Sequence, residues 1–136
     1  MHTSIRGIVK IEDSYLLIHR KKLQEDGTLR EYYVIPGGKQ EKLETDEETL
    51  IREMKEEVGI KISVGDKLFS LESSYDDSVQ IFYSCNYVSG EIGTGDGEEK
   101  YREYKEGELF QVELVPSQKI SSINLVPIEI KDVISE

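Results

Sequence analysis

The chain has 136 residues, of which 17 are basic and 28 acidic, so its formal net charge at pH 7 is −11. A surface this acidic repels nucleic acid and anionic lipid, which excludes both as general partners. The single cysteine, Cys85, excludes an internal disulfide, and no apolar run reaches the length of a membrane span. We expect one domain over residues 1–136, located in the cytoplasm, because the first residues lack the form of a signal peptide.

The first 38 residues show the pattern of three β-strands that lead into a glycine loop. β-branched and apolar residues predict strands over residues 3–11, 15–20 and 30–35. A turn signal joins the first two strands, which we expect to form a hairpin. His19 lies within the apolar second strand, where we expect a structural role. The third strand ends at Pro36-Gly37-Gly38, a sequence typical of a loop.

Residues 45–58 have the clearest helical pattern in the chain. Thr45 is a good N-cap residue, and Glu48 three positions later completes a capping box. Gly59 follows at the place where many helices end in a left-handed residue. Apolar residues at helical spacing predict a buried stripe, which consists of Leu50, Ile51, Met54 and Val58.

Three glutamates of this helix share one face, because Glu53, Glu56 and Glu57 stand at i, i+3 and i+4. In an acidic protein such a face is usually only solvated. Here the like charges repel one another by a few tenths of a kcal/mol per pair, and only Arg52 offers local compensation. The preceding glycine loop adds free backbone carbonyls near the helix start. Carboxylates and carbonyls together are the ligands that hard cations prefer, so we predict a divalent-metal site for phosphate chemistry.

The second half of the chain is predicted to be mostly β-structure. Within residues 61–73 we expect a strand, a turn at Gly65-Asp66 and another strand, followed by a strand over residues 78–88. Cys85 lies on the apolar face of this last strand, so we interpret it as a packed thiol. A strand over residues 109–115 and a connection lead to a short helix over residues 127–134, whose predicted buried residues are Ile130, Val133 and Ile134.

Residues 90–97 are the most unusual segment, because four of the 11 glycines lie within these eight positions. Such a composition is typical of a flexible loop. Glycine loops also cradle phosphate, but the neighbouring acidic residues argue against that role here. The remaining alternative is a loop that brings a further carboxylate to the predicted metal site.

One stretch of the sequence resembles the signature of a known family, the Nudix box. Its fixed residues recur at the right spacing, including the aliphatic positions, and the order of strands and helices around it is also similar to a Nudix domain. The resemblance implies an α/β fold, namely the Nudix α/β/α sandwich, in which a mixed β-sheet lies between helices. The matching positions are Gly38, Glu44, Arg52, Glu53, Met54, Glu56, Glu57, Gly59 and Ile60.

The same resemblance implies hydrolysis of the diphosphate bridge of a nucleoside diphosphate linked to another moiety, by water that Mg²⁺ or Mn²⁺ activates. It implies a general base, for which we name Glu53, and a positioning role for Arg52. The implied catalytic residues are Glu53, Glu57 and Arg52. The implied metal ligands are Gly38, Glu53, Glu56, Glu57 and, from beyond the box, Glu98, with Glu99 and Glu103 as alternatives. The implied substrate contacts are Arg6, Arg20 and Tyr33.

Simpler interpretations of the substrate contacts remain open. Arg20 begins a basic cluster that is equally typical of a solvated strand end. Tyr33 and the neighbouring Tyr32 are explained either by packing or by stacking on a base.

The substrate and the assembly also remain open. ADP-ribose hydrolases often have a proline at a site beyond the box where this chain reads Ser73-Ser74-Tyr75-Asp76. A tyrosine in this region favours dinucleoside polyphosphates, while a nucleoside triphosphate or a nucleotide sugar fits equally well. The alternative function is a Nudix domain that binds a nucleotide as a sensor without hydrolysis, although the intact glutamates argue against it. A homodimer is compatible with the resemblance.

Overall fold

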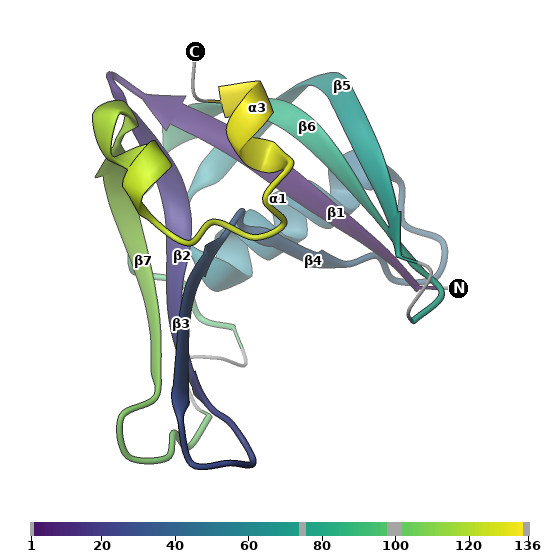
Figure 1. The fold of residues 1–136 in the computed structure, drawn as a ribbon. Helices are drawn as coiled ribbons and strands as arrows, with labels where there is room; N and C mark the ends of the chain where they lie inside the picture. The colour runs from purple at the N-terminus through teal and green to yellow at the C-terminus, as the bar shows by residue number, and fades with distance from the viewer. Residues whose placement is uncertain (1, 74–75, 98–101, 135–136) are drawn as a thin grey trace.

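The computed structural model describes residues 2–73, 76–97 and 102–134, which fold as strands with helices on both sides (Figure 1). None of the helices in this part of the chain is both long and apolar enough to cross a membrane. The elements in chain order are β1 (His2–Ile11), β2 (Ser14–Leu23), β3 (Leu29–Val34), β4 (Gly37–Lys39), α1 (Asp46–Glu57), β5 (Lys61–Ser73), β6 (Ser78–Ser89), β7 (Leu109–Pro116), the 3₁₀-helix η1 (Ser117–Ser122) and α3 (Ile130–Ile134).

The sheet is mixed and divides into two halves. β1 pairs in parallel with β6, whereas the other pairings are antiparallel. β1 and β2 are paired only at their shared turn, through Lys10 with Tyr15 and Ile11 with Ser14, and then diverge. Beyond that point β1 lies between β4 and β6, with β5 outside, and we call these strands the first half-sheet. β2 lies between β3 and β7, and these three strands form the second half-sheet.

Two hydrophobic cores lie on opposite faces of the sheet, which confirms the predicted α/β/α sandwich. On one face α1 buries Leu50, Met54 and Val58 against residues of β1, β2, β5 and β6. On the other face Ile120 of η1 and Ile130 of α3 pack around Phe82. Figure 1 shows α1 behind the sheet and α3 in front of it. The strands β1, β2 and β6 each supply side chains to both cores.

The helix α1 begins and ends as predicted. The Glu48 amide donates to Thr45 Oγ1 at 3.1 Å, and the Thr45 amide donates to Glu48 Oε1 at 2.9 Å, which completes the capping box. The predicted buried stripe is wrong at Ile51, whose exposure is 42%. Thr49 is fully buried instead, because its hydroxyl is hydrogen-bonded to the Thr45 carbonyl at 3.0 Å and the Glu44 carboxylate at 3.1 Å and so carries no unpaired polar group into the core.

The prediction that Cys85 is a packed thiol is confirmed. Its exposure is 5%, and it belongs to the core beneath α1. Burial in this apolar environment raises the pKa of the Cys85 thiol to about 12.

Three other expectations need correction. Residues 61–73 form one continuous strand, because a bulge near Gly65 absorbs the irregularity while pairing with β6 continues on both sides. The sequence predicts a loop at Pro36-Gly37-Gly38, but Gly37–Lys39 form the short strand β4, which pairs with β1. The last helix begins at Ile130 and not at residue 127, and Val133 is 39% exposed because it lies on the flank of a helix of little more than one turn.

Candidate active site

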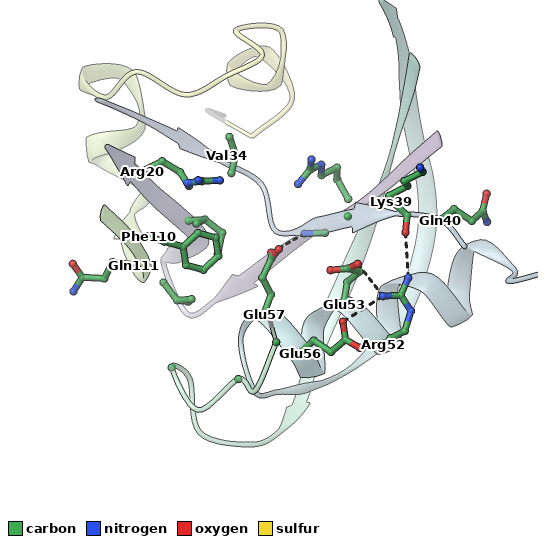
Figure 2. A pocket seen from close by; sticks show the side chains of 18 of the residues that line it. Arg20, Val34, Lys39, Gln40, Arg52, Glu53, Glu56, Glu57, Phe110 and Gln111 are labelled. Carbon is green, nitrogen blue, oxygen red and sulfur yellow. Dashed lines mark hydrogen bonds and ion pairs between the residues drawn. The ribbon is translucent and has the colours of Figure 1, made fainter. Parts of the chain in front are cut away.

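A cavity of about 1260 Å³ opens where the two half-sheets diverge. Two walls of different chemistry face it. The acidic wall comes from α1 and β4 and includes Gly37, Gly38, Arg52, Glu53, Glu56 and Glu57. The aromatic wall comes from the second half-sheet and includes Ile18, Arg20, Tyr32, Val34, Phe110 and Val112. Figure 2 shows the three glutamates reaching from α1 toward the cavity, with Arg20 and Phe110 on the far side.

The predicted glutamate face lines this cavity, although its members differ in burial. The Glu53 side chain is 16% exposed and the Glu56 side chain 49%. Glu57 Oε1 accepts a hydrogen bond of 3.3 Å from the Gly37 amide, which ties α1 to β4. Burial is the main cause that raises the pKa of Glu53, and the nearby Arg52 and Arg6 partly oppose it.

The two glycines of β4 are required by close packing. Gly37 has φ +149°, and a Cβ there would lie 2.1 Å from the Ile5 carbonyl oxygen of β1. A Cβ on Gly38 would lie 2.5 Å from the Glu53 carboxylate. The carboxylate of Glu53 therefore lies directly against the backbone of β4. A side chain at Gly38 would occupy the space that this carboxylate fills.

Arg52 joins the acidic wall to the loop that precedes α1. Its Nε donates to Glu44 Oε2 at 2.7 Å and its Nη2 to Glu44 Oε1 at 2.9 Å, a bidentate pair. Its Nη1 donates to Glu53 Oε1 at 3.0 Å, and its Nη2 also reaches the Lys39 carbonyl at 3.2 Å. The hydrogen bonds from Arg52 lower the pKa of Glu44 to about 2 and, in turn, the Glu44 carboxylate raises the pKa of Arg52.

The oxygen atoms on the acidic wall are suitable ligands for a hard divalent cation. They are carboxylate oxygens of α1 and backbone oxygens of β4. A cation there would also offset the cost of burying the Glu53 carboxylate. Across residues 2–73, 76–97 and 102–134, no three acidic, histidine or cysteine side chains already converge on one metal position. In the present arrangement Arg52 donates to Glu53 and the Gly37 amide donates to Glu57.

Two arginines, Arg6 and Arg20, line the cavity. Arg6 of β1 donates from Nη1 to the Ile35 carbonyl at 3.1 Å, and Arg20 of β2 places its guanidinium 5.1 Å from the centre of the Phe110 ring. In the described chain, the Nε atoms of both arginines are buried without a hydrogen-bond partner. Burial lowers the pKa of Arg6, while Glu57 and Glu53 oppose the shift. Two guanidinium groups that line a cavity are suited to an anionic ligand.

The structure places the predicted substrate residue Tyr33 away from the cavity, whereas Tyr32 lines it. Alternate residues of a strand face opposite sides of the sheet, and the register pairs Tyr32 with Arg20 and Tyr33 with His19. The Tyr33 ring stacks on the His19 ring with centroids 4.3 Å apart, on the side away from the acidic wall. Sequence reasoning also missed Phe110, because its place opposite Arg20 depends on the pairing of β7 with β2.

The expected extra carboxylate is not placed by the structure. Glu98 and Glu99 lie outside the described residues, as do Ser74 and Tyr75 of the substrate-class segment. Glu103 is exposed and is not among the residues that line the cavity. The glycine-rich segment does reach the cavity, through Gly93, Gly95 and Gly97.

Comparison with known proteins places this fold and cavity in one family. The family model described as NUDIX domain matches residues 1–132, so the chain belongs to the NUDIX family. An ADP-ribose pyrophosphatase of Methanocaldococcus jannaschii is 31% identical over 118 residues, which cover 83% of this chain. The match spans 63% of that relative's length.

Solved structures agree with the fold. A NUDIX hydrolase from Nitrosomonas europaea matches with a TM-score of 0.72 at 18% identity, covering 98% of this chain and 68% of the other. A MutT NUDIX hydrolase from Burkholderia pseudomallei matches with a TM-score of 0.70 at 20% identity, covering 99% and 98%. The divided mixed sheet with helices on both faces is therefore the architecture of this family.

Proposed function

We propose that this protein hydrolyses the diphosphate bridge of a nucleoside diphosphate linked to another moiety, with the help of Mg²⁺ or Mn²⁺. The observation that carries the proposal is the pairing of two walls in one cavity. The acidic wall offers hard oxygen ligands, and the aromatic wall offers Arg20 beside Phe110. A diphosphate that carries an aromatic base has complementary groups for both walls.

The acidic wall would hold the metal through Glu53, Glu56, Glu57 and the backbone at Gly38. When bound, the metal neutralises negative charge on the diphosphate and makes the attacking water more acidic. Arg52 holds Glu53 by the 3.0 Å hydrogen bond and so fixes its orientation in the cavity. We assign Glu53 as the general base, because it lines the cavity and the hydrogen bond from Arg52 fixes its carboxylate there.

The reaction balances with these groups. The water oxygen forms a bond to one phosphorus, and the bond from that phosphorus to the bridging oxygen breaks. The proton released by the water passes to the Glu53 carboxylate, and the second phosphate leaves with the bridging oxygen. The products are two phosphate monoesters, unless the linked moiety is itself phosphate.

The aromatic wall would hold the nucleoside end. Arg6 and Arg20 line the cavity, and their guanidinium groups can donate to phosphate oxygens. Tyr32 and Phe110 offer ring faces on which a base can stack. In this assignment Tyr32 takes the role that the sequence predicts for Tyr33. The relative from Methanocaldococcus jannaschii is named an ADP-ribose pyrophosphatase, so ADP-ribose is the first substrate to test.

A substrate panel with metal controls tests this function. Purified protein is incubated with ADP-ribose, nucleotide sugars, dinucleoside polyphosphates and nucleoside triphosphates, in Mg²⁺, in Mn²⁺ and in EDTA. Phosphate is measured with and without added phosphatase, which reveals monoester products. We expect turnover of one group that EDTA abolishes. Tight nucleotide binding without turnover of any compound would contradict hydrolysis and favour a sensor.

A further inference from the structure

The glycine-rich segment 90–97 is attached to the end of the helix that carries the glutamates. The Gly93 amide donates to the Val58 carbonyl at 2.8 Å, and the Gly97 amide donates to the Glu56 carbonyl at 2.8 Å. The last carbonyls of a helix have no partner within the helix. This segment therefore supplies partners to the final turn of α1, which carries Glu56 and Glu57.

The contact is too close for any residue other than glycine. A Cβ on Gly95 would lie 2.4 Å from the Glu56 carbonyl oxygen and 2.7 Å from the Glu57 carbonyl carbon. A Cβ on Gly97 would lie 2.9 Å from the same oxygen of Glu56. These atoms belong to the backbone and cannot move aside by a change of rotamer. A side chain at Gly95 must displace either the segment or the helix turn.

The segment is also part of the cavity, because Gly93, Gly95 and Gly97 line it beside Glu56 and Glu57. The sequence indicates either a flexible loop or a carrier of an extra carboxylate. In the structure, the backbone amides of this segment instead donate hydrogen bonds to carbonyls at the end of α1. A displacement of about 1 Å in a catalytic group can cost roughly 10²-fold in rate, so a change that shifts this turn would alter the rate.

We propose that segment 90–97 positions Glu56 and Glu57, and that Gly95 is the positioning residue on which this depends. The inference rests on the proposed function, since it assigns the segment a role in that same site. The acidic wall then consists of α1, β4 and segment 90–97, which together fix the carboxylates from two sides.

The test compares Gly95→Ala with Gly27→Ala. Gly27 lies in the β2–β3 connection with φ +86°, and a Cβ added there would meet no atom within 4 Å, so its substitution strains the backbone without touching the cavity. For Gly95→Ala we expect kcat to fall at least tenfold while KM stays within twofold, because the aromatic wall is unchanged. Mn²⁺ binding, measured by electron paramagnetic resonance, should weaken severalfold. Gly27→Ala should keep wild-type kcat and Mn²⁺ affinity.

Wild-type kcat and Mn²⁺ affinity in Gly95→Ala would overturn the inference. If the wild type hydrolyses nothing in the panel, the proposed function fails separately, and hydrogen–deuterium exchange over residues 53–58 then decides. Faster exchange there in Gly95→Ala than in Gly27→Ala supports the positioning role, and equal exchange in the two variants overturns it.

Discussion

Glu57 shows how much one residue contributes to both structure and chemistry. Its carboxylate lines the cavity, accepts from the Gly37 amide and lies close enough to Arg6 to oppose the lowering of that residue's pKa. A glutamine of the same shape can still accept the Gly37 hydrogen bond but carries no charge. The structural role would survive this change, whereas a metal ligand and its charge would be lost.

We therefore expect Glu57→Gln to lower kcat by at least 100-fold while the melting temperature stays within a few degrees of wild type. Steady-state kinetics and thermal unfolding measure the two effects. Glu47→Gln is the matched control, because Glu47 is an exposed residue in the first turn of the same helix and does not line the cavity. Wild-type turnover by Glu57→Gln would show that the acidic wall is misassigned.

Glu44 gives a prediction for pH. Its pKa in the folded protein is about 2, below the ordinary 4.5, because Arg52 and the Glu41 amide donate hydrogen bonds to it. A carboxyl group with a lowered pKa stabilises the fold above pH 4.5 and loses that contribution as the pH falls toward 2. Glu44→Gln should thus melt below wild type at pH 7, and the difference should narrow from about pH 4.5 downward. Melting curves of both proteins at several pH values between about 7 and 3 test this prediction. A difference in melting temperature that stays constant with pH would contradict it.

At the scale of elements, His19 connects the three strands of the second half-sheet. Its Nδ1 lies 2.7 Å from Glu113 Oε2 on β7, and its Nε2 lies 2.6 Å from Glu31 Oε2 on β3. The His19 ring therefore lies between one carboxylate of β7 and one of β3, and it links both strands to β2. The ring also stacks on Tyr33, behind the strands that carry the aromatic wall.

Removing this connection should loosen the second half-sheet. We expect His19→Leu to reduce the free energy of unfolding by about 1–2 kcal/mol, since two carboxylates would face each other without a donor between them. Chemical denaturation measures the change. In a Glu113→Gln background His19→Leu should reduce the free energy of unfolding by less. An equal reduction in the two backgrounds would show that the hydrogen bond to Glu113 does not contribute to stability.

The elements also show why some features could be predicted from sequence and others could not. The signals for α1 are local: Thr45 and Glu48 cap it, and the spacing of Glu53, Glu56 and Glu57 defines its acidic face. The aromatic wall depends instead on register between strands that are distant in sequence. A shift of one residue exchanges Tyr32 for Tyr33, and nothing within either strand fixes that choice.

The segment 90–97 illustrates the same limit from another direction. Its glycines predict an irregular backbone, and that much is confirmed. The need for glycine at Gly95 comes from another element, because Gly95 packs on the backbone carbonyls of α1. Composition indicates where a chain can approach another closely, but only the fold identifies the partner.

At the scale of the whole molecule, the two walls of the cavity belong to different half-sheets. This predicts separate kinetic effects for substitutions on each wall. Phe110→Leu should raise KM for a nucleotide substrate about tenfold, as expected for loss of base stacking, while kcat stays within twofold. Leucine retains an apolar contact with the core on which Phe110 packs. A fall in kcat with unchanged KM would place Phe110 in the chemical step instead.

The early divergence of β1 and β2 has a consequence for how such a protein can change. The strands separate after Lys10–Tyr15 and Ile11–Ser14. Beyond that point β2, β3 and β7 line the cavity without pairing with the strands of the first half-sheet. Substrate preference can be rewritten there by mutation, in the laboratory or in evolution, while α1 and β4 stay as they are. A library restricted to Arg20, Tyr32, Phe110 and Gln111, which all line the cavity, would sample new nucleoside moieties while the sequence of α1 and β4 stays unchanged.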